Sequence, residues 1–255
     1  MYLVRKSREH KGYFGNEGNA RMYGHGICTL ALCEAYGMLE QEKDNMAIKD
    51  AIERAMKVIL YAQMKDEKHN NWGGWRYEPR PGDADLSVAV WQMLALRSAQ
   101  NCQLEVPDES IEIAKKYVRR TFNPGQKGFS YQSNKNNASP AMRTAGVVAL
   151  LALGSKHDDR DQKLMKESMA FLEKHDPGRA SHFYYTSYYL ATAANMFGPE
   201  LRKEFLPRLE KALIKLQRDN GEFTKHSGHQ GGVYATAFSV ICLCVHYQYL
   251  PIYQE

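Results

Sequence analysis

The stretch LSVAVW, residues 86–91, opens a segment with helical periodicity that is apolar on nearly every side, and four comparable segments occur elsewhere in the chain. When the five segments are aligned, each has a small or hydroxyl residue at the equivalent position near its start. These anchor residues are Gly26, Ser87, Thr144, Thr186 and Thr236. Successive anchors lie about 40 to 60 residues apart, which is the spacing expected when each unit is one helical hairpin of a solenoid or closed ring. Five such units account for nearly all of the 255 residues.

Longer amphipathic segments lie between the apolar ones. In the clearest of them, residues 44–64, Met46, Ile52 and Ile59 follow the 3.6-residue period and charged side chains stand between them. The same design recurs at residues 110–120, 162–174 and 200–217. Apolar helices would be buried on all sides and amphipathic ones solvated on one face, so we expect two concentric layers with the apolar helices inside. The sequence predicts an all-α protein, an α/α toroid of about five hairpins, as one domain over residues 1–255.

Composition excludes several classes of function. The 34 Lys and Arg against 29 Asp and Glu give a net charge of +5 spread over the whole length, so we expect no nucleic-acid partner. The longest apolar run, residues 145–153, is much shorter than the roughly 20 residues of a membrane span, so none is expected. The five Cys residues are odd in number and lie mostly in apolar segments, as reduced core thiols do. The default expectation is a cytoplasmic location, with an upstream signal or anchor left open.

A loop motif resembles that of a known family. The stretch QRDNGEF, residues 217–223, resembles the prenyltransferase and squalene-oxidase repeat, with Phe in the place of Trp, and looser copies are GGWRY at 73–77 and KGFSY at 127–131. The resemblance implies an α/α toroid like that of terpene cyclases and protein prenyltransferase β-subunits, with a central cavity at the N-termini of the inner helices. The YGHG opening at 23–26 and the YLPIYQ ending at 249–254 most resemble uncharacterised single-domain bacterial members.

Two aspartates are the catalytic candidates that this resemblance suggests. Class II cyclases protonate an alkene with a D-x-D-D-T motif, and the aligned stretch here is DADLS, residues 83–87, which keeps two of the three carboxylates. Asp85 matches the protonating acid, and Asp83 could raise its pKa by like-charge repulsion. The structural alternative is that Asp83 caps the following helix and Asp85 sits in its first turn, where the helix dipole favours an acid.

The sequence predicts neither a metal nor a cofactor. Protein prenyltransferases need zinc held by an Asp-x-Cys and a His, and this chain has Ala235 where the His would stand. His25 and Cys28 could share a helix face but would still lack two ligands, and His226 and His229 form only a loop pair. No G-x-S-x-G elbow or phosphate-binding loop occurs, so hydrolase and nucleotide-binding functions have no support.

Polar and aromatic side chains would gather at the mouth of the cavity if all inner helices begin at one end. Aromatic faces stabilise carbocations, and Arg143 could hold a diphosphate or a carboxylate. Structural roles compete with this interpretation, because loop aromatics such as Trp75 can clamp hairpins together and Arg143 could pair with Asp83 or Asp85. The candidate ligand-binding residues are His25, Trp75, Arg143, His182, Tyr184, Tyr185 and Tyr234.

Three functional hypotheses follow. The first is a terpenoid-cyclase-like or prenyltransferase-like protein that binds an isoprenoid or another hydrophobic small molecule; catalysis as a cyclase, isomerase or prenyl transferase stays open, because the zinc ligands and the third aspartate are missing. It predicts a deep apolar cavity. The second is a non-catalytic scaffold for a peptide or protein partner, which predicts a filled or shallow centre. The third is a polysaccharide-acting enzyme, which needs two carboxyl groups facing each other across an open cleft.

Overall fold

The computed structural model describes residues 1–16, 21–80, 82–224 and 232–254. In these residues the ten α-helices are α1 (Tyr2–Glu9), α2 (Arg21–Ala35), α3 (Glu42–Ala62), α4 (Leu86–Asn101), α5 (Asp108–Thr121), α6 (Pro140–Ala152), α7 (Asp159–Met169), α8 (Phe183–Phe197), α9 (Pro199–Ile214) and α10 (Val233–Cys244). Short 3-10 turns are η1 (Ser155–His157), η2 (Ala170–Lys174), η3 (Pro177–Arg179), η4 (Val245–Tyr247) and η5 (Pro251–Tyr253). Strands β1 (Phe122–Asn123) and β2 (Gly128–Phe129) pair antiparallel.

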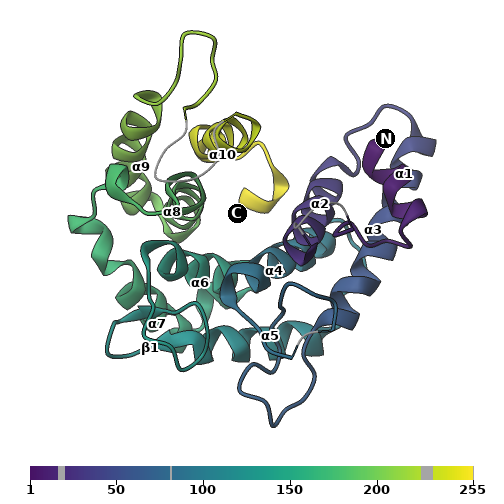
Figure 1. The fold of residues 1–255 in the computed structure, drawn as a ribbon, viewed down its shortest axis with the longest axis horizontal. Coiled ribbons are helices and arrows are strands. Elements are labelled where there is room, and N and C mark those ends of the chain that lie inside the picture. Colours follow the sequence, from purple (N-terminus) through teal and green to yellow (C-terminus); the bar gives the residue numbers. More distant parts are fainter. Residues whose placement is uncertain (17–20, 81, 225–231, 255) are drawn as a thin grey trace.

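The helices form two layers, which confirms the predicted all-α, α/α-toroid fold. Helices α2, α4, α6, α8 and α10 pack against one another in chain order on the inside of an arc (Figure 1). Helices α3, α5, α7 and α9 lie outside them, and α1 packs on α3. The five inner helices, four of which are followed by an outer helix, make an open arc, and the C-terminal segment reaches into the opening between α10 and α2 (Figure 1).

The two layers follow from the two hydrophobic patterns. In the inner helix α4, every residue from Leu86 to Leu96 is buried, whereas the outer helix α3 buries Ile48, Ile52 and Ile59 on one face only. Each buried side chain of this size contributes roughly 1.5–3 kcal/mol relative to exposure. An all-round apolar helix gains this energy only when other elements surround it, so α4 lies in the inner layer.

The Gly-aromatic loops clamp adjacent hairpins. The Trp75 side chain is fully buried, and its Nε1 donates to the carbonyl oxygen of Ile59 at 2.8 Å. Gln63, the upstream residue of the same loop motif, donates from Nε2 to the carbonyls of Gly73 at 3.1 Å and Ser110 at 2.9 Å. These contacts tie α3 to the loop that follows it and to α5. The loop motif therefore holds hairpins together, and Trp75 is part of that clamp.

We expect Gly146→Ala to lower the free energy of unfolding by about 1–3 kcal/mol, because it overpacks the core. A Cβ at Gly146 in α6 would overlap the fully buried ring of Phe129, which packs directly against this glycine. Urea denaturation measures the change. Gly82→Ala is the matched control, because a Cβ at Gly82 meets open space. Equal loss of stability in the two variants would contradict the predicted clash.

Candidate functional site

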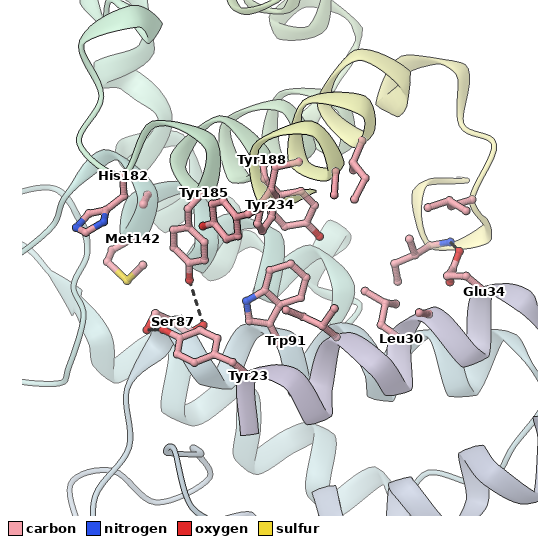
Figure 2. Close-up of a pocket in the computed structure, with 18 of the residues that line it drawn as sticks. Tyr23, Leu30, Glu34, Ser87, Trp91, Met142, His182, Tyr185, Tyr188 and Tyr234 are labelled. Carbon is pink, nitrogen blue, oxygen red and sulfur yellow. Dashed lines mark hydrogen bonds between the residues drawn. The ribbon is translucent and has the colours of Figure 1, made fainter. Parts of the chain in front are cut away.

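A large pocket lies on the inner side of the arc (Figure 2). Its cavity volume is about 1110 Å³, and its walls come from all five inner helices and the C-terminal segment. The aromatic lining residues are Tyr23, Tyr77, Trp91, Tyr131, Tyr185, Tyr188, Tyr234, Phe238 and Tyr253. The first residues of α2, α4, α6, α8 and α10 all contribute, so the N-terminal ends of the inner helices converge on one space as the sequence predicts.

The pocket is elongated along α2. The lining residues on and just after this helix are Tyr23, Ile27, Leu30, Ala31, Glu34, Ala35 and Met38. They are spaced three, four or one apart and form one stripe on the helix surface. Tyr23 and Ala35 are separated by twelve positions, or about 18 Å at the α-helical rise of 1.5 Å per residue. The pocket is therefore long enough along α2 to hold an extended ligand.

One end of the pocket is rich in hydroxyl groups, and we call it the hydroxyl end: Tyr23, Tyr77, Ser87, Tyr131 and Tyr185. The Tyr23 hydroxyl is hydrogen-bonded to Ser87 Oγ, and the Tyr185 hydroxyl donates to the carbonyl oxygen of Ser87 at 3.2 Å. The hydroxyls of Tyr77 and Tyr131 lie 2.7 Å apart. These groups are neutral and can donate or accept hydrogen bonds.

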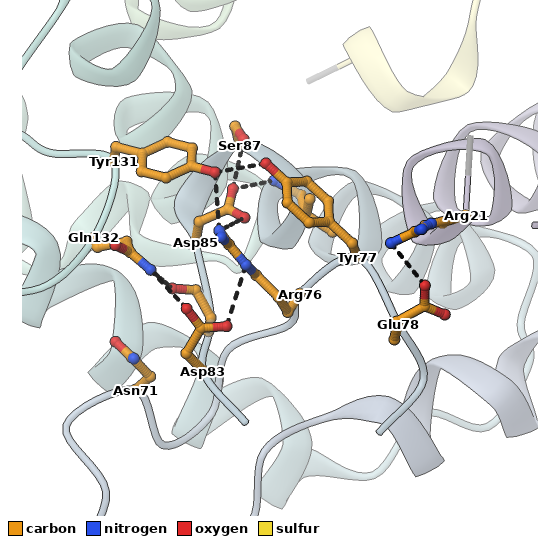
Figure 3. A network of polar contacts seen from close by, with 12 residues as sticks. Arg21, Asn71, Arg76, Tyr77, Glu78, Asp83, Asp85, Ser87, Tyr131 and Gln132 are labelled. Carbon is orange, nitrogen blue, oxygen red and sulfur yellow. Dashed lines mark hydrogen bonds and ion pairs between the residues drawn. The ribbon is translucent and has the colours of Figure 1, made fainter. Parts of the chain in front are cut away.

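Asp85 lies directly behind the hydroxyl end and does not line the pocket (Figure 3). It is the N-cap of α4: its Oδ1 accepts from the Val88 backbone N–H at 3.0 Å and from Ser87 Oγ at 2.5 Å. The expectation that Asp83 caps this helix is therefore wrong. Burial raises the pKa of the fully buried Asp85 carboxyl, although the Arg76 guanidinium beside it acts in the opposite direction. Ser87 and Tyr23 connect Asp85 to the pocket.

Arg76 is the partner of both aspartates, and the sequence reasoning missed it. Its guanidinium pairs with Asp85, and its Nε lies 3.1 Å from Asp83 Oδ1. It also donates to the Tyr131 hydroxyl at 2.8 Å and covers the face of the Tyr77 ring at 4.3 Å. The two carboxylates are thus joined to the hydroxyl end by a continuous polar network (Figure 3).

Arg143 does not pair with either aspartate, so that expectation is also wrong. Its guanidinium donates to three backbone carbonyls, those of Gln126 at 2.6 Å, Lys127 at 2.7 Å and Ala138 at 2.9 Å. It also lies 5.4 Å from the centroid of the Phe171 ring. The loop before α6 therefore supplies the oxygen partners that the sequence assigned to a carboxylate or a diphosphate, and Arg143 does not line the pocket.

The remaining candidates divide into two groups. His182, Tyr185 and Tyr234 line the pocket, and His182 has a left-handed backbone with φ of 49° at the start of α8. His25, Trp75 and Tyr184 do not line it: Tyr184 is buried and donates its hydroxyl to the carbonyl of Thr224. The sequence predicted that these residues lie near the starts of helices or in loops, as they do. It did not predict the direction in which each side chain points.

His25 is a buried structural histidine. Its Nδ1 accepts from the Phe14 backbone N–H at 3.3 Å, and its Nε2 lies 3.1 Å from the carbonyl oxygen of Ala55, so Nε2 carries the proton. A second proton on Nδ1 would break the bond to Phe14. Burial lowers the pKa of His25 from 6.5 to about 4.

We expect His25 to make stability depend on pH. Because its folded-state pKa of about 4 lies below 6.5, the unfolded chain takes up the proton first as the pH falls. The contribution of His25 is therefore present above pH 6.5 and is lost as the pH falls toward 4. Between pH 7 and pH 4, wild type should lose about 3 kcal/mol more than His25→Gln. Urea denaturation across this range tests it, and parallel pH profiles would contradict it.

Trp91 and Glu34 are two lining residues that the sequence reasoning did not select. Trp91 stacks on Tyr188 with ring centroids 5.0 Å apart, and its Nε1 is buried with no hydrogen-bond partner within the described part of the chain. At the end opposite the hydroxyl end, Glu34 accepts from Ser98 Oγ and, through Oε2, from the Ile252 backbone N–H at 3.1 Å. Burial raises the pKa of Glu34. An acid in the apolar helix α2 was the available signal, since a buried carboxylate needs donors.

No group of three His, Cys, Asp or Glu side chains in the described residues is arranged to hold a metal ion. The loop pair His226 and His229 lies outside those residues. Within the described ranges, no helix has both the length and the apolar character of a membrane span.

The fold and the pocket together define a class: an α/α toroid whose inner helices surround an apolar, ligand-sized space. No protein-family model and no curated protein matches the sequence. Among solved structures, the chain is similar to Candida albicans protein geranylgeranyltransferase-I complexed with GGPP, with a TM-score of 0.58 and 14% identity over 94% of this chain and 74% of that one. At this identity the likeness shows a shared prenyltransferase-like fold, and membership of the repeat family stays a prediction.

Proposed function

We propose that the protein, as a single domain over residues 1–255, binds an isoprenoid or a similarly elongated hydrophobic molecule in this pocket. The observation that carries the proposal is a cavity of about 1110 Å³ with a mainly apolar and aromatic lining. Small-molecule sites are typically concave, mostly apolar and about 300–1,000 Å³ in volume. Each CH₂ group that such a ligand buries contributes roughly 0.8 kcal/mol. The likeness to a protein complexed with GGPP agrees with this assignment.

The polar groups of the lining favour an uncharged head over a diphosphate. A diphosphate requires cationic donors, and the described lining residues include neither Lys nor Arg. Three guanidiniums near the inner-helix starts are engaged: Arg21 with Glu78, Arg76 with Asp83 and Asp85, and Arg143 with backbone carbonyls. The hydroxyl end and the free Nε1 of Trp91 match an alcohol. The proposed ligand is therefore an isoprenoid alcohol or hydrocarbon.

Asp85 and Asp83 are proposed to orient the ligand rather than to protonate it. Asp85 accepts from Ser87, Val88 and Arg76, and these contacts favour the ionised carboxylate, which carries no proton to donate. Through Ser87, Asp85 holds the Tyr23 hydroxyl in place at the pocket wall. Catalysis therefore does not form part of the proposal.

The two alternative hypotheses fit the pocket less well. A scaffold for a protein partner predicts a filled or shallow centre, and the cavity is neither. A polysaccharide-acting enzyme needs two carboxyl groups that face each other across the cleft. The described lining offers Glu34 alone, and Ser98 and Ile252 already occupy its oxygens.

Calorimetric titration with geranylgeraniol, squalene and geranylgeranyl diphosphate tests both parts of the proposal. We expect geranylgeraniol to bind with a micromolar Kd and at least about tenfold more tightly than the diphosphate, because the latter loses its hydration without gaining cationic partners. No heat with any of the three would refute the isoprenoid assignment and favour the scaffold. Tighter binding of the diphosphate would refute the uncharged head.

A further inference from the structure

The C-terminal strap, residues 248–254, walls the end of the pocket opposite the hydroxyl end. Leu250, Ile252 and Tyr253 line the pocket, and Ile252 and Tyr253 are only 5% and 6% exposed. The turn η5 within the strap packs against α4 and α8. Figure 2 shows this segment beside Glu34, at the far end from Tyr23. The strap therefore forms part of the wall at this end of the cavity.

Few polar contacts attach the strap to the helices it covers. The Ile252 backbone N–H donates to Glu34 Oε2 at 3.1 Å, and the Tyr253 hydroxyl lies 3.5 Å from that of Tyr188. Among the described residues, its other hydrogen bonds are internal or run to the preceding turn η4, such as the Tyr253 N–H to the Leu250 carbonyl at 3.0 Å and the Gln248 N–H to the Val245 carbonyl at 3.2 Å. Of the two outward contacts, the one to Glu34 is shorter and involves a carboxylate, which makes it the stronger.

We propose that the C-terminal strap sets the length of ligand that the pocket accepts, and that Glu34 is the positioning residue that holds the strap in place. The inference rests on the proposed function. The hydroxyl end fixes the polar head, so the distance from it to the strap determines which chain fits. A shorter ligand leaves apolar surface unfilled, and a longer one must displace Ile252 and Tyr253 and break the contact with Glu34.

The test compares the Kd values of farnesol, geranylgeraniol and geranylfarnesol, which differ by one isoprene unit each. For each protein, we compare the Kd of geranylfarnesol with the Kd of the alcohol that binds wild type best. In Glu34→Ala this ratio should fall by about tenfold, because the strap loses a charge-assisted hydrogen bond and yields more easily to the longer chain. Glu34→Gln keeps an oxygen acceptor for the Ile252 N–H and should retain the wild-type ratio. Ile252→Ala keeps the backbone hydrogen bond to Glu34 but removes side-chain volume from the pocket wall. This variant should therefore bind the longer alcohol more tightly relative to the shorter ones.

Hydrogen exchange at the Ile252 amide reports on the strap without any ligand. We expect this amide to exchange slowly in wild type and Glu34→Gln and at least about tenfold faster in Glu34→Ala. Equal exchange in all three would overturn the role of Glu34. Unchanged length selectivity in both Glu34→Ala and Ile252→Ala, with ligands still bound, would overturn the inference while leaving the proposed function intact. No binding of any alcohol by wild type would overturn both.

Discussion

Arg76→Met is expected to lower the free energy of unfolding by about 3–4 kcal/mol, the largest stability effect predicted for this protein. The substitution leaves the fully buried Asp85 carboxylate without its cation, and breaking a buried ion pair costs about 3–5 kcal/mol. It also removes a donor to the Tyr131 hydroxyl and the contact with Asp83. Urea denaturation near neutral pH measures the loss.

Two further variants make this prediction specific. Arg80→Met removes an exposed arginine that contacts the Tyr61 hydroxyl at the surface, and it should change stability by less than about 0.5 kcal/mol. Arg76→Met combined with Asp85→Asn should be more stable than Arg76→Met alone, because the amide keeps the cap on α4 without a buried charge. If the double variant were the less stable, Asp85 would not be ionised in the folded protein.

Ala237→Trp is expected to weaken the binding of geranylgeraniol at least about 100-fold by filling the pocket. Ala237 lies on α10, lines the pocket and is exposed to it, so the larger side chain enters free space rather than the packed core. We therefore expect the free energy of unfolding to change by less than about 1 kcal/mol. Calorimetric titration gives the affinity, and urea denaturation shows that the variant is folded.

Val240→Trp is the matched control on the same helix. Val240 is 49% exposed and does not line the pocket, so the same side chain placed there should leave the affinity within about twofold of wild type. Wild-type affinity in both variants would place the ligand somewhere other than the pocket. A loss in both would indicate that bulk on α10 disturbs the site indirectly.

The layered architecture could be predicted because it depends on patterns that the sequence displays directly. The stretch 86–91 is apolar on all sides, so it must be surrounded, and residues 44–64 have one charged face, so they must be solvated. Helix starts were also predictable where Pro marks them: Pro107 caps α5 and Pro199 begins α9. Local chemistry determines these features without knowledge of the neighbours.

The direction of single side chains was less predictable because it depends on how each helix is rotated. Tyr184 and Tyr185 are adjacent on α8, yet Tyr185 lines the pocket and Tyr184 donates to the loop carbonyl of Thr224. His25 lies two residues after Tyr23 on α2 but is buried against the carbonyl of Ala55. The repeat identifies the end of the helix on which a residue lies, and tertiary packing decides whether that residue meets a ligand.

Irregular loops account for the two wrong ion-pair and capping assignments. Arg143 donates to backbone carbonyls of residues 126–138. Every residue has such a carbonyl, so the pattern of side chains does not predict which ones accept. Asp83 and Asp85 are only two residues apart. Because α4 begins at Leu86, Asp85 is the residue that caps it. Arg76 directly follows Trp75 in the loop motif, and the motif does not indicate that its side chain contacts Asp83 and Asp85.

Photo-crosslinking with a diazirine-bearing geranylgeraniol, mapped by mass spectrometry, is the most direct test of ligand binding inside the arc. We expect adducts on the α2 stripe, on α10 and on Trp91, and we expect Ala237→Trp to suppress them while Val240→Trp does not. Adducts confined to the outer helices α3, α5, α7 and α9, or adducts unchanged in Ala237→Trp, would contradict an isoprenoid site in the pocket.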